Sequence, residues 1–148
     1  MYKKILLPTD GSENSKRAGK HAIWIADKSG ADIIVLNVVE FYYPQISALP
    51  NYREGLYDDI MMEGETAVES FRKELELNQC NGVCKTVKLT TKIKEGKAHL
   101  EILESIDEDD VDLVVMGASG RHGLDRFMLG SVTERVIREA KCPVLVVH

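Results

Sequence analysis

Residues 111–134 read VDLVVMGASGRHGLDRFMLGSVTE, a short apolar run followed by a glycine-containing segment and a polar, helix-forming stretch. The apolar run from Val111 to Met116 is too short for a helix and is flanked by Asp110 and Gly117, so it predicts a buried β-strand. Gly117 and Gly120 lack a Cβ atom, which allows positive φ or the close approach of a ligand. The predicted strand therefore leads into a turn that is suited to binding.

A helix start follows this turn. Gly130 precedes Ser131-Val132-Thr133-Glu134, a capping box in which Ser131 caps the helix and Glu134 reaches back to its start. The N–H groups of Val132 and Thr133 then stay free, with the positive end of the helix dipole behind them. Because such a terminus favours anions, the sequence predicts a phosphate-type site here.

The rest of the chain alternates between apolar strands and amphipathic helices. Near-continuous apolar runs predict strands covered on both faces, whereas the alternation over 87–93 predicts a half-exposed edge strand. We expect strands at 2–8, 33–39, 87–93, 111–116 and 144–147. We expect one helix closed by Ser29-Gly30, a second over 56–77, a third ended by Asp107–Asp110, and a fourth from Ser131 to the Cys142-Pro143 break, with Val132, Val136, Ile137 and Ala140 facing the core. Residues Phe41 to Arg53 have no clean period and predict an irregular excursion.

Strict alternation of strands and helices predicts the fold class. Five strands and four helices indicate an α/β protein with three layers, in which helices cover both faces of an open parallel sheet. Right-handed crossovers and the half-exposed third strand favour the strand order 3-2-1-4-5 in one domain, residues 1–148. The switch point then lies between the first and fourth strands, where Asp10 and Gly117 end those strands. Sheets of this kind bind ligands at that place.

Composition limits the possible functions. The 148 residues, 44% of them hydrophobic and 29% charged, fit an ordinary globular protein. A net charge of −5 argues against nucleic acid as the main partner. No stretch is long enough to span a bilayer and no signal peptide is apparent, so we expect a cytoplasmic protein without a membrane partner.

Few polar clusters suggest another kind of site. The three cysteines are an odd count and predict free thiols. The acidic run Asp107–Asp110 has no evident basic or metal-binding complement and predicts solvated surface, so we expect no metal-ligating residues. His21 and His99 have no visible partner either.

The glycine spacing separates this turn from two common phosphate loops. Gly117-x-x-Gly120, nine residues and then Gly130-Ser131 match neither a Walker P-loop nor the dinucleotide fingerprint. The pattern resembles the motif G-x2-G-x9-G-S/T of the ATP-binding branch of the universal stress protein family. Similar segments cover nearly the whole chain: KKILLPTDGSENS, VLNVVE, VDLVVMGASGRHG, LGSVTERV and CPVLVV. The resemblance implies a fold like that of the adenine nucleotide alpha hydrolases.

The resemblance also implies a binding site for ATP, ADP or AMP. Asp10 is expected near the adenine and ribose, the Val38 backbone at the adenine, and the two glycine segments at the phosphates. The residues so assigned are Pro8, Thr9, Asp10, Val38, Met116, Gly117, Ala118, Ser119, Gly120, Arg121, His122, Gly130, Ser131, Val132 and Thr133. Asp10 has an alternative role as the cap of the first helix. Arg121 and His122 either pair with phosphate or are solvated loop residues.

Few groups in this set suggest catalysis. There is no P-loop lysine and no obvious base beside the glycines, so we assign no catalytic residue. Asp10 and the hydroxyls of Thr9, Ser131 or Thr133 are available to hold Mg²⁺ with the phosphates. These features predict a nucleotide-dependent regulatory or stress-response switch with weak or no ATP hydrolysis.

Two alternatives from other classes stay open. An adenine-nucleotide hydrolase would carry Ser-Gly-Gly-x-Asp-Ser after the first strand, where this chain has Pro8-Thr9-Asp10-Gly11-Ser12. The other alternative is an interaction protein that binds no nucleotide. The apolar strand Val144 to Val147 at the far sheet edge predicts a homodimer, as does the resemblance. We also expect a regulatory protein partner, which the sequence does not identify.

Overall fold

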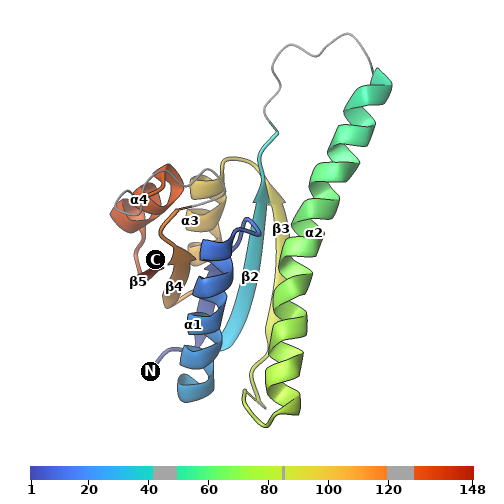
Figure 1. Ribbon diagram of the computed structural model, residues 1–148. Coiled ribbons are helices and arrows are strands. Elements are labelled where there is room, and N and C mark those ends of the chain that lie inside the picture. The colour runs from blue at the N-terminus through green and yellow to red at the C-terminus, as the bar shows by residue number, and fades with distance from the viewer. Residues whose placement is uncertain (42–49, 85, 120–128) are drawn as a thin grey trace.

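The computed structural model describes residues 1–41, 50–84, 86–119 and 129–148, and side chains of its second helix from residue 55 onward. Strands and helices alternate along the chain (Figure 1). The elements are β1 (Lys4–Pro8), α1 (Glu13–Ser29), β2 (Asp32–Val39), α2 (Pro50–Cys80), β3 (Leu89–Glu95), α3 (Ala98–Glu108), β4 (Leu113–Gly117), α4 (Ser131–Glu139) and β5 (Val144–Val147).

All five strands pair in one parallel sheet with the order β3-β2-β1-β4-β5. This confirms the predicted class and strand order. β1 lies at the centre and is fully paired with β2, from Lys4 opposite Asp32 to Pro8 opposite Leu36. β3 and β5 form the two edges. The switch point therefore lies between the carboxyl ends of β1 and β4, as predicted.

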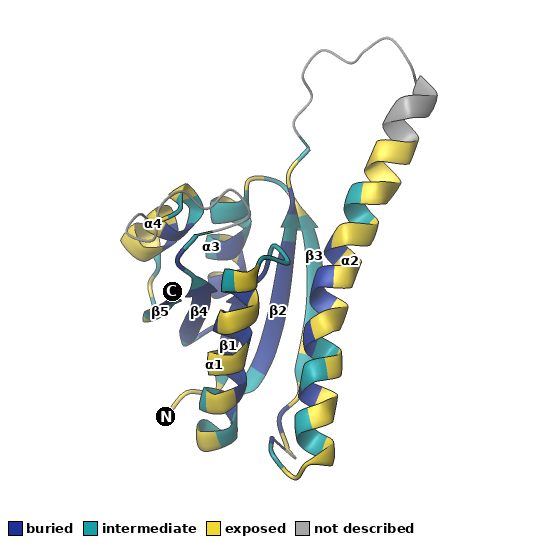
Figure 2. Cartoon of the chain, in the orientation of Figure 1, coloured by how far each residue is buried: buried dark blue, intermediate teal, exposed yellow. Residues whose placement is uncertain are grey.

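Helices cover both faces of the sheet (Figure 1). α1 and α2 pack on one face against a core cluster that includes Ile5, Val35 and Phe71. α3 and α4 pack on the other face against a cluster that includes Leu6 and Val114. Figure 2 shows the buried strands between these two layers. Because successive residues of a strand point to opposite faces, the continuous apolar runs supply both clusters.

Element boundaries differ from the predictions in several places. Pro50 to Arg53, predicted as part of the irregular excursion, belong to α2, while 42–49 lie outside the described residues. The second helix begins at Pro50 rather than at residue 56, the first strand begins at Lys4 rather than Tyr2, and the other shifts are of one to three residues. Ile137 was expected to face the core but is 42% exposed, because Val136 takes the central buried position of the short helix α4.

The acidic end of α3 is paired with lysines, contrary to the prediction. Lys92 Nζ lies 2.6 Å from Asp109 Oδ2 and Lys141 Nζ lies 2.7 Å from Asp107 Oδ2. Lys94 Nζ contacts both Glu104 and Glu108. These ion pairs join α3 to β3 and to the segment before β5, so the acidic run contributes to packing between elements.

Candidate functional site

The turn after β1 is held by buried hydrogen bonds. Thr9 is 5% exposed, and its N–H donates to Leu36 O at 2.8 Å. Its hydroxyl donates to Ser15 Oγ at 3.1 Å, and Asn37 Nδ2 donates to its carbonyl at 2.8 Å. Pro8, the last residue of β1, is also buried. Thr9 therefore shapes the base of the switch point, and its N–H, its carbonyl and its hydroxyl all form hydrogen bonds.

Asp10 shapes the next part of this turn. Its Oδ1 accepts a hydrogen bond from the Ser12 N–H at 3.0 Å, around Gly11 at φ 76°. Ser12, rather than Asp10, caps α1, because its side chain accepts from the Ser15 N–H. The alternative role of Asp10 as the helix cap is therefore wrong. Its carboxylate lies at the carboxyl end of the central strand, where a ligand is expected.

The backbone of Val38 faces the switch point. In a parallel strand the N–H and C=O groups of successive residues point alternately to the two neighbours. Leu36 O accepts from Thr9, so the even-numbered residues of β2 face β1, and Val38 lies beyond the last paired residue Pro8. The Thr9 carbonyl bonds to the Asn37 side chain instead of Val38. Neither backbone group of Val38 bonds to another described residue.

Gly117 ends β4 for a packing reason. Its φ is not among the positive values found at other glycines, so positive φ, one of the two reasons that the sequence offered for this glycine, does not apply. A Cβ atom at position 117 would lie 2.9 Å from the backbone carbon of Asn14 and 2.9 Å from its Cβ. The missing side chain thus lets β4 approach the first turn of α1. The sequence could not distinguish this reason from ligand approach.

The segment between β4 and α4 is tied together at its base. Ala118 N donates to Val147 O, and Ala118 O accepts from Gly130 N, both at 2.8 Å. The buried Thr133 hydroxyl donates to Gly117 O at 2.9 Å. These bonds fix the start of α4 beside the end of β4. Met116, the residue before Gly117 in β4, is 4% exposed and belongs to the core. Its side chain therefore packs inside the protein, beneath the site.

The capping box predicted for α4 is wrong. Gly130 occupies the cap position with φ −65° and has no side chain to cap the helix, and Ser131 is the first helical residue. Glu134 therefore lies one residue too far along to reach back, and its Oε1 bonds to Arg138 Nη2 at 2.6 Å instead. The first helical bond runs from Glu134 N to Gly130 O.

The start of α4 offers more donors than the capping box would. The N–H groups of Ser131, Val132 and Thr133 precede the first helical bond and bond to no other described residue. Three N–H groups with the helix dipole behind them suit an anion better than two. Ser131 is exposed, so solvent or a ligand can reach this terminus.

One contact at the site was not predicted from the sequence. Asn14 Nδ2, in the first turn of α1, donates to Ser119 O at 3.0 Å and to Ser119 Oγ at 2.7 Å. The two residues are 105 positions apart, and no local pattern signals their pairing. Gly120, Arg121 and His122 lie outside the described residues, so their predicted roles remain predictions.

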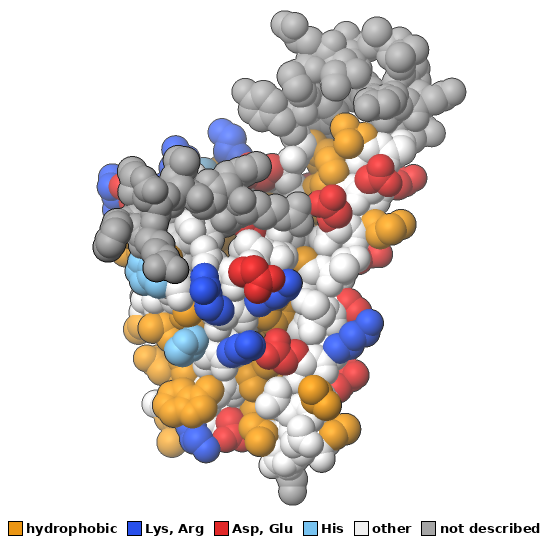
Figure 3. Space-filling view, viewed as in Figure 1, with side chains coloured by type: hydrophobic (Ala, Val, Ile, Leu, Met, Phe, Trp, Pro, Cys, Tyr) orange, Lys and Arg blue, Asp and Glu red, His pale blue; other side chains and the backbone are white. Residues whose placement is uncertain are grey.

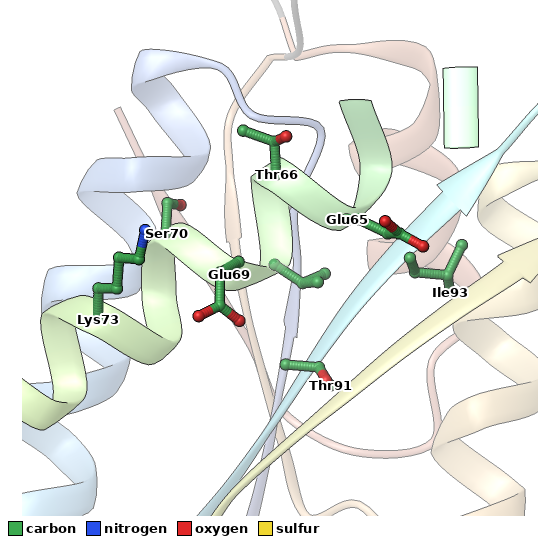
Figure 4. A pocket seen from close by; sticks show the side chains of 8 residues that line it. Glu65, Thr66, Glu69, Ser70, Lys73, Thr91 and Ile93 are labelled. Carbon is green, nitrogen blue, oxygen red and sulfur yellow. The ribbon is translucent and has the colours of Figure 1, made fainter. Parts of the chain in front are cut away.

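Other polar groups lie on different elements. His99 was expected to have no partner, but its Nε2 lies 3.2 Å from Arg135 Nη1. The described residues hold no group of three or more His, Cys, Asp or Glu side chains arranged to bind a metal ion. An open hollow of about 750 Å³ lies between α2 and β3, lined by residues such as Glu65, Lys73 and Thr91 (Figure 4). It contains none of the predicted site residues.

Charges of both signs mix on the surface. Figure 3 shows basic and acidic side chains interspersed over α1 and α2. Lys16 and Glu13, for example, pair at 2.7 Å on α1. The described residues of this face therefore carry charges of both signs, whereas a nucleic-acid backbone requires a basic patch. Among the described residues, no helix has both the length and the apolar character needed to cross a membrane.

Comparison with known proteins identifies the family. A sequence model described as "Universal stress protein family" matches residues 1–148. The chain belongs to the universal stress protein family. It is 41% identical over 148 residues to the universal stress protein MJ0531 of Methanocaldococcus jannaschii, covering 99% of this chain and 82% of that protein.

Solved structures of family members share the fold. The structure of MJ0577 from the same organism has a TM-score of 0.81 at 34% identity, covering 99% of this chain and 96% of that one. A universal stress protein in complex with cAMP has a TM-score of 0.66 at 26% identity, covering 99% and 97%. An Arabidopsis thaliana member with AMP bound has a TM-score of 0.65 at 21% identity, covering 98% and 90%. Some universal stress proteins of this fold thus bind adenine nucleotides.

Proposed function

We propose that this universal stress protein binds an adenine nucleotide, with ATP as the first candidate, and acts as a nucleotide-dependent regulatory switch. The observation that carries the proposal is the uncapped start of α4 at the switch point of the sheet. Its three N–H groups have no protein acceptor among the described residues, and Thr133 holds this terminus against Gly117. A phosphate group is the ligand that such a terminus favours.

The end of β2 supports an adenine as the other part of the ligand. Val38 has an N–H donor and a C=O acceptor directed past the end of β1. A purine edge with a ring nitrogen and an exocyclic amine is complementary to such a pair. Asp10, just after β1, is suited to ribose hydroxyls, since each oxygen of a carboxylate can accept more than one hydrogen bond. The relatives with cAMP and AMP support the same ligand class.

We propose that hydrolysis is slow at most. Thr9 and Thr133 donate their hydroxyl protons to Ser15 and Gly117, so their oxygen atoms stay candidate ligands for Mg²⁺. Asp10 and Ser131 also carry oxygen atoms of the kind that Mg²⁺ prefers, so we propose them as ligands for Mg²⁺ on the phosphates. An ATPase also needs a group that orients the attacking water. We assign the role of orienting that water to no titratable side chain among the described residues at this site.

Ligand identification tests the proposal. The purified protein is denatured, the released small molecules are identified by mass spectrometry, and the absorbance ratio at 260 and 280 nm is measured on the native protein. We expect ATP, ADP or AMP near one molecule per chain. The Gly130→Val variant should lose most of it, because a branched side chain at the cap would obstruct the phosphates.

A second glycine provides the control. Gly130 has φ −65°, which any residue adopts, so Gly130→Val does not strain the backbone. Gly55→Ala changes a glycine of α2 that has open space around it and should retain the nucleotide. Equal nucleotide content in wild type and Gly130→Val would contradict the proposed phosphate site. No nucleotide in wild type, with none bound on titration, would favour the interaction-protein alternative.

We further propose a cytoplasmic, single-domain homodimer that pairs through β5. The outward backbone groups of β5 belong to Val144 and Val146, since Pro143 O and Val147 O bond toward β4. Leu145 on this strand is 36% exposed. The other edge, β3, carries Lys92 and Lys94, and lysines discourage pairing at an edge. A closed two-fold dimer would cover the apolar edge.

A further inference from the structure

We infer that Asn14 is a positioning residue for the phosphates, because it converts Ser119 into a hydrogen-bond donor. This inference rests on the proposed nucleotide site. Asn14 lies in the first turn of α1 and Ser119 follows β4, so their contact joins the two turns that meet at the switch point. Neither residue type nor spacing in the sequence signals this role.

The geometry engages both acceptors of Ser119. Asn14 Nδ2 donates to the carbonyl at 3.0 Å and to the hydroxyl oxygen at 2.7 Å. An amide nitrogen has two hydrogens and no acceptor, so the serine oxygen must accept in this bond. The hydroxyl proton is then available for a different acceptor. Ser119 is half-buried, which leaves that proton accessible to a ligand.

A phosphate oxygen is a suitable acceptor for this proton. The ionised oxygens of a phosphate at neutral pH accept hydrogen bonds and do not donate them. A carbonyl oxygen directed at them would therefore repel them. Asn14 keeps the Ser119 carbonyl engaged with α1 and the serine hydroxyl as a donor. The site thereby gains one oriented O–H group beside the three N–H groups of α4.

The orientation of the Asn14 amide is itself fixed. Arg17 Nη2 donates to Asn14 Oδ1 one turn further along α1. An arginine has only donors, so this bond assigns the oxygen of the amide to Arg17 and the nitrogen to Ser119. Gly117 contributes as well, because a side chain there would displace Asn14. Arg17 and Ser119 thus hold the Asn14 amide in place, and Gly117 leaves room for it.

The test compares ATP with adenosine, which has the same base and sugar and no phosphate. Dissociation constants of both ligands are measured by titration calorimetry for wild type, Asn14→Ala and Asn14→Asp. We expect ATP binding to weaken about tenfold in Asn14→Ala, as for the loss of one charge-assisted hydrogen bond. Asn14→Asp should weaken it further, because a carboxylate cannot donate to Ser119 and repels phosphate. Adenosine affinity should change less than about twofold.

Two further variants separate positioning from a general structural effect. If Asn14 acts through Ser119, adding Asn14→Ala to Ser119→Ala should weaken ATP binding far less than Asn14→Ala does alone. Asn78→Ala removes a comparable amide, bonded to Glu74 O in α2, and should leave both ligands unaffected. Additive effects, unchanged ATP affinity in Asn14→Ala, or equal losses for ATP and adenosine would each overturn the inference. Wild-type protein that binds neither ligand would overturn the proposed function as well.

Discussion

The ring of Phe71 in α2 occupies the space beside Gly19 in α1. A Cβ atom at position 19 would lie 2.0 Å from Phe71 Cε1 and 2.6 Å from Cδ1, far inside contact distance. Phe71 is 1% exposed and belongs to the core cluster under α1 and α2. The close approach of these two helices therefore depends on the glycine.

Gly19→Ala should destabilise the fold. The added methyl group must displace a fully buried ring, so we expect the free energy of unfolding to fall by about 1–3 kcal/mol in urea denaturation. Gly55→Ala is the control, since no atom lies within 4 Å of a Cβ there. It should be neutral or stabilising by up to about 1 kcal/mol, because alanine favours a helix. Similar changes in the two variants would show that the ring contact is not the cause.

Asp27 should make stability depend on pH. Its Oδ2 lies 2.9 Å from Lys28 Nζ, and its Oδ1 accepts from the N–H of Cys84 at 2.8 Å. The Lys28 hydrogen bond and then the Cys84 N–H hold the pKa of the Asp27 carboxyl below its ordinary value. A folded-state pKa below the unfolded one, about 3.9, means that the stabilisation is present above that pH and is lost as pH falls through the folded pKa.

The matching variant is Asp27→Asn, which keeps an acceptor for Cys84 but removes the charge. We expect it to be less stable than wild type in urea at pH 6, with a smaller difference at pH 3, which lies below the unfolded pKa of about 3.9. If the difference were the same at both pH values, the carboxylate charge would not be responsible.

The cysteines should differ in reactivity. Cys80 is exposed, whereas Cys84 is 3% exposed, its Sγ donates to Ile23 O at 3.3 Å, and burial raises the pKa of its thiol. A disulfide reagent at pH 8 should modify Cys80 at least about tenfold faster than Cys84, because only the thiolate reacts. Peptide mapping of the modified protein gives the rates. In guanidinium chloride the rates should converge, and a fast Cys84 in the native protein would contradict the burial.

Leu145→Lys should dissociate the proposed dimer. A charge on the apolar edge strand opposes pairing with a second copy, so sedimentation velocity at micromolar concentration should change from dimer to monomer. Thr90→Lys places the same charge on the exposed opposite edge and should leave the dimer intact. A monomeric wild type would contradict the proposal outright.

Strand order and layers could be predicted because they follow from periodicity and handedness, which are local properties. Details that depend on distant partners could not. The capping box at Ser131 fits its local pattern, yet the bonds of Gly130 to Ala118 and of Thr133 to Gly117 set the helix start one residue earlier. Likewise Gly117 is required by Asn14, more than a hundred positions away.

The same limit applies to the site. The topology could be predicted to bring the turn after β1 and the end of β4 to one edge of the sheet, and the start of α4 is bonded beside the end of β4. Asn14 was missed, since its partner is defined only by the packing of α1 on β4. The lysines that pair with the acidic end of α3 were missed for the same reason.

The double hydrogen bond at Ala118 has a consequence for how this family can diverge. The Ala118 N–H donates to Val147 O in β5, and the Ala118 C=O accepts from Gly130 N at the start of α4. The chain is therefore held both where it leaves β4 and where it returns before α4. Both bonds use backbone groups, so they do not depend on which side chains the sequence carries between positions 118 and 130. Family members can therefore differ in sequence over that interval and still keep the two bonds that join β4 to β5 and to the start of α4.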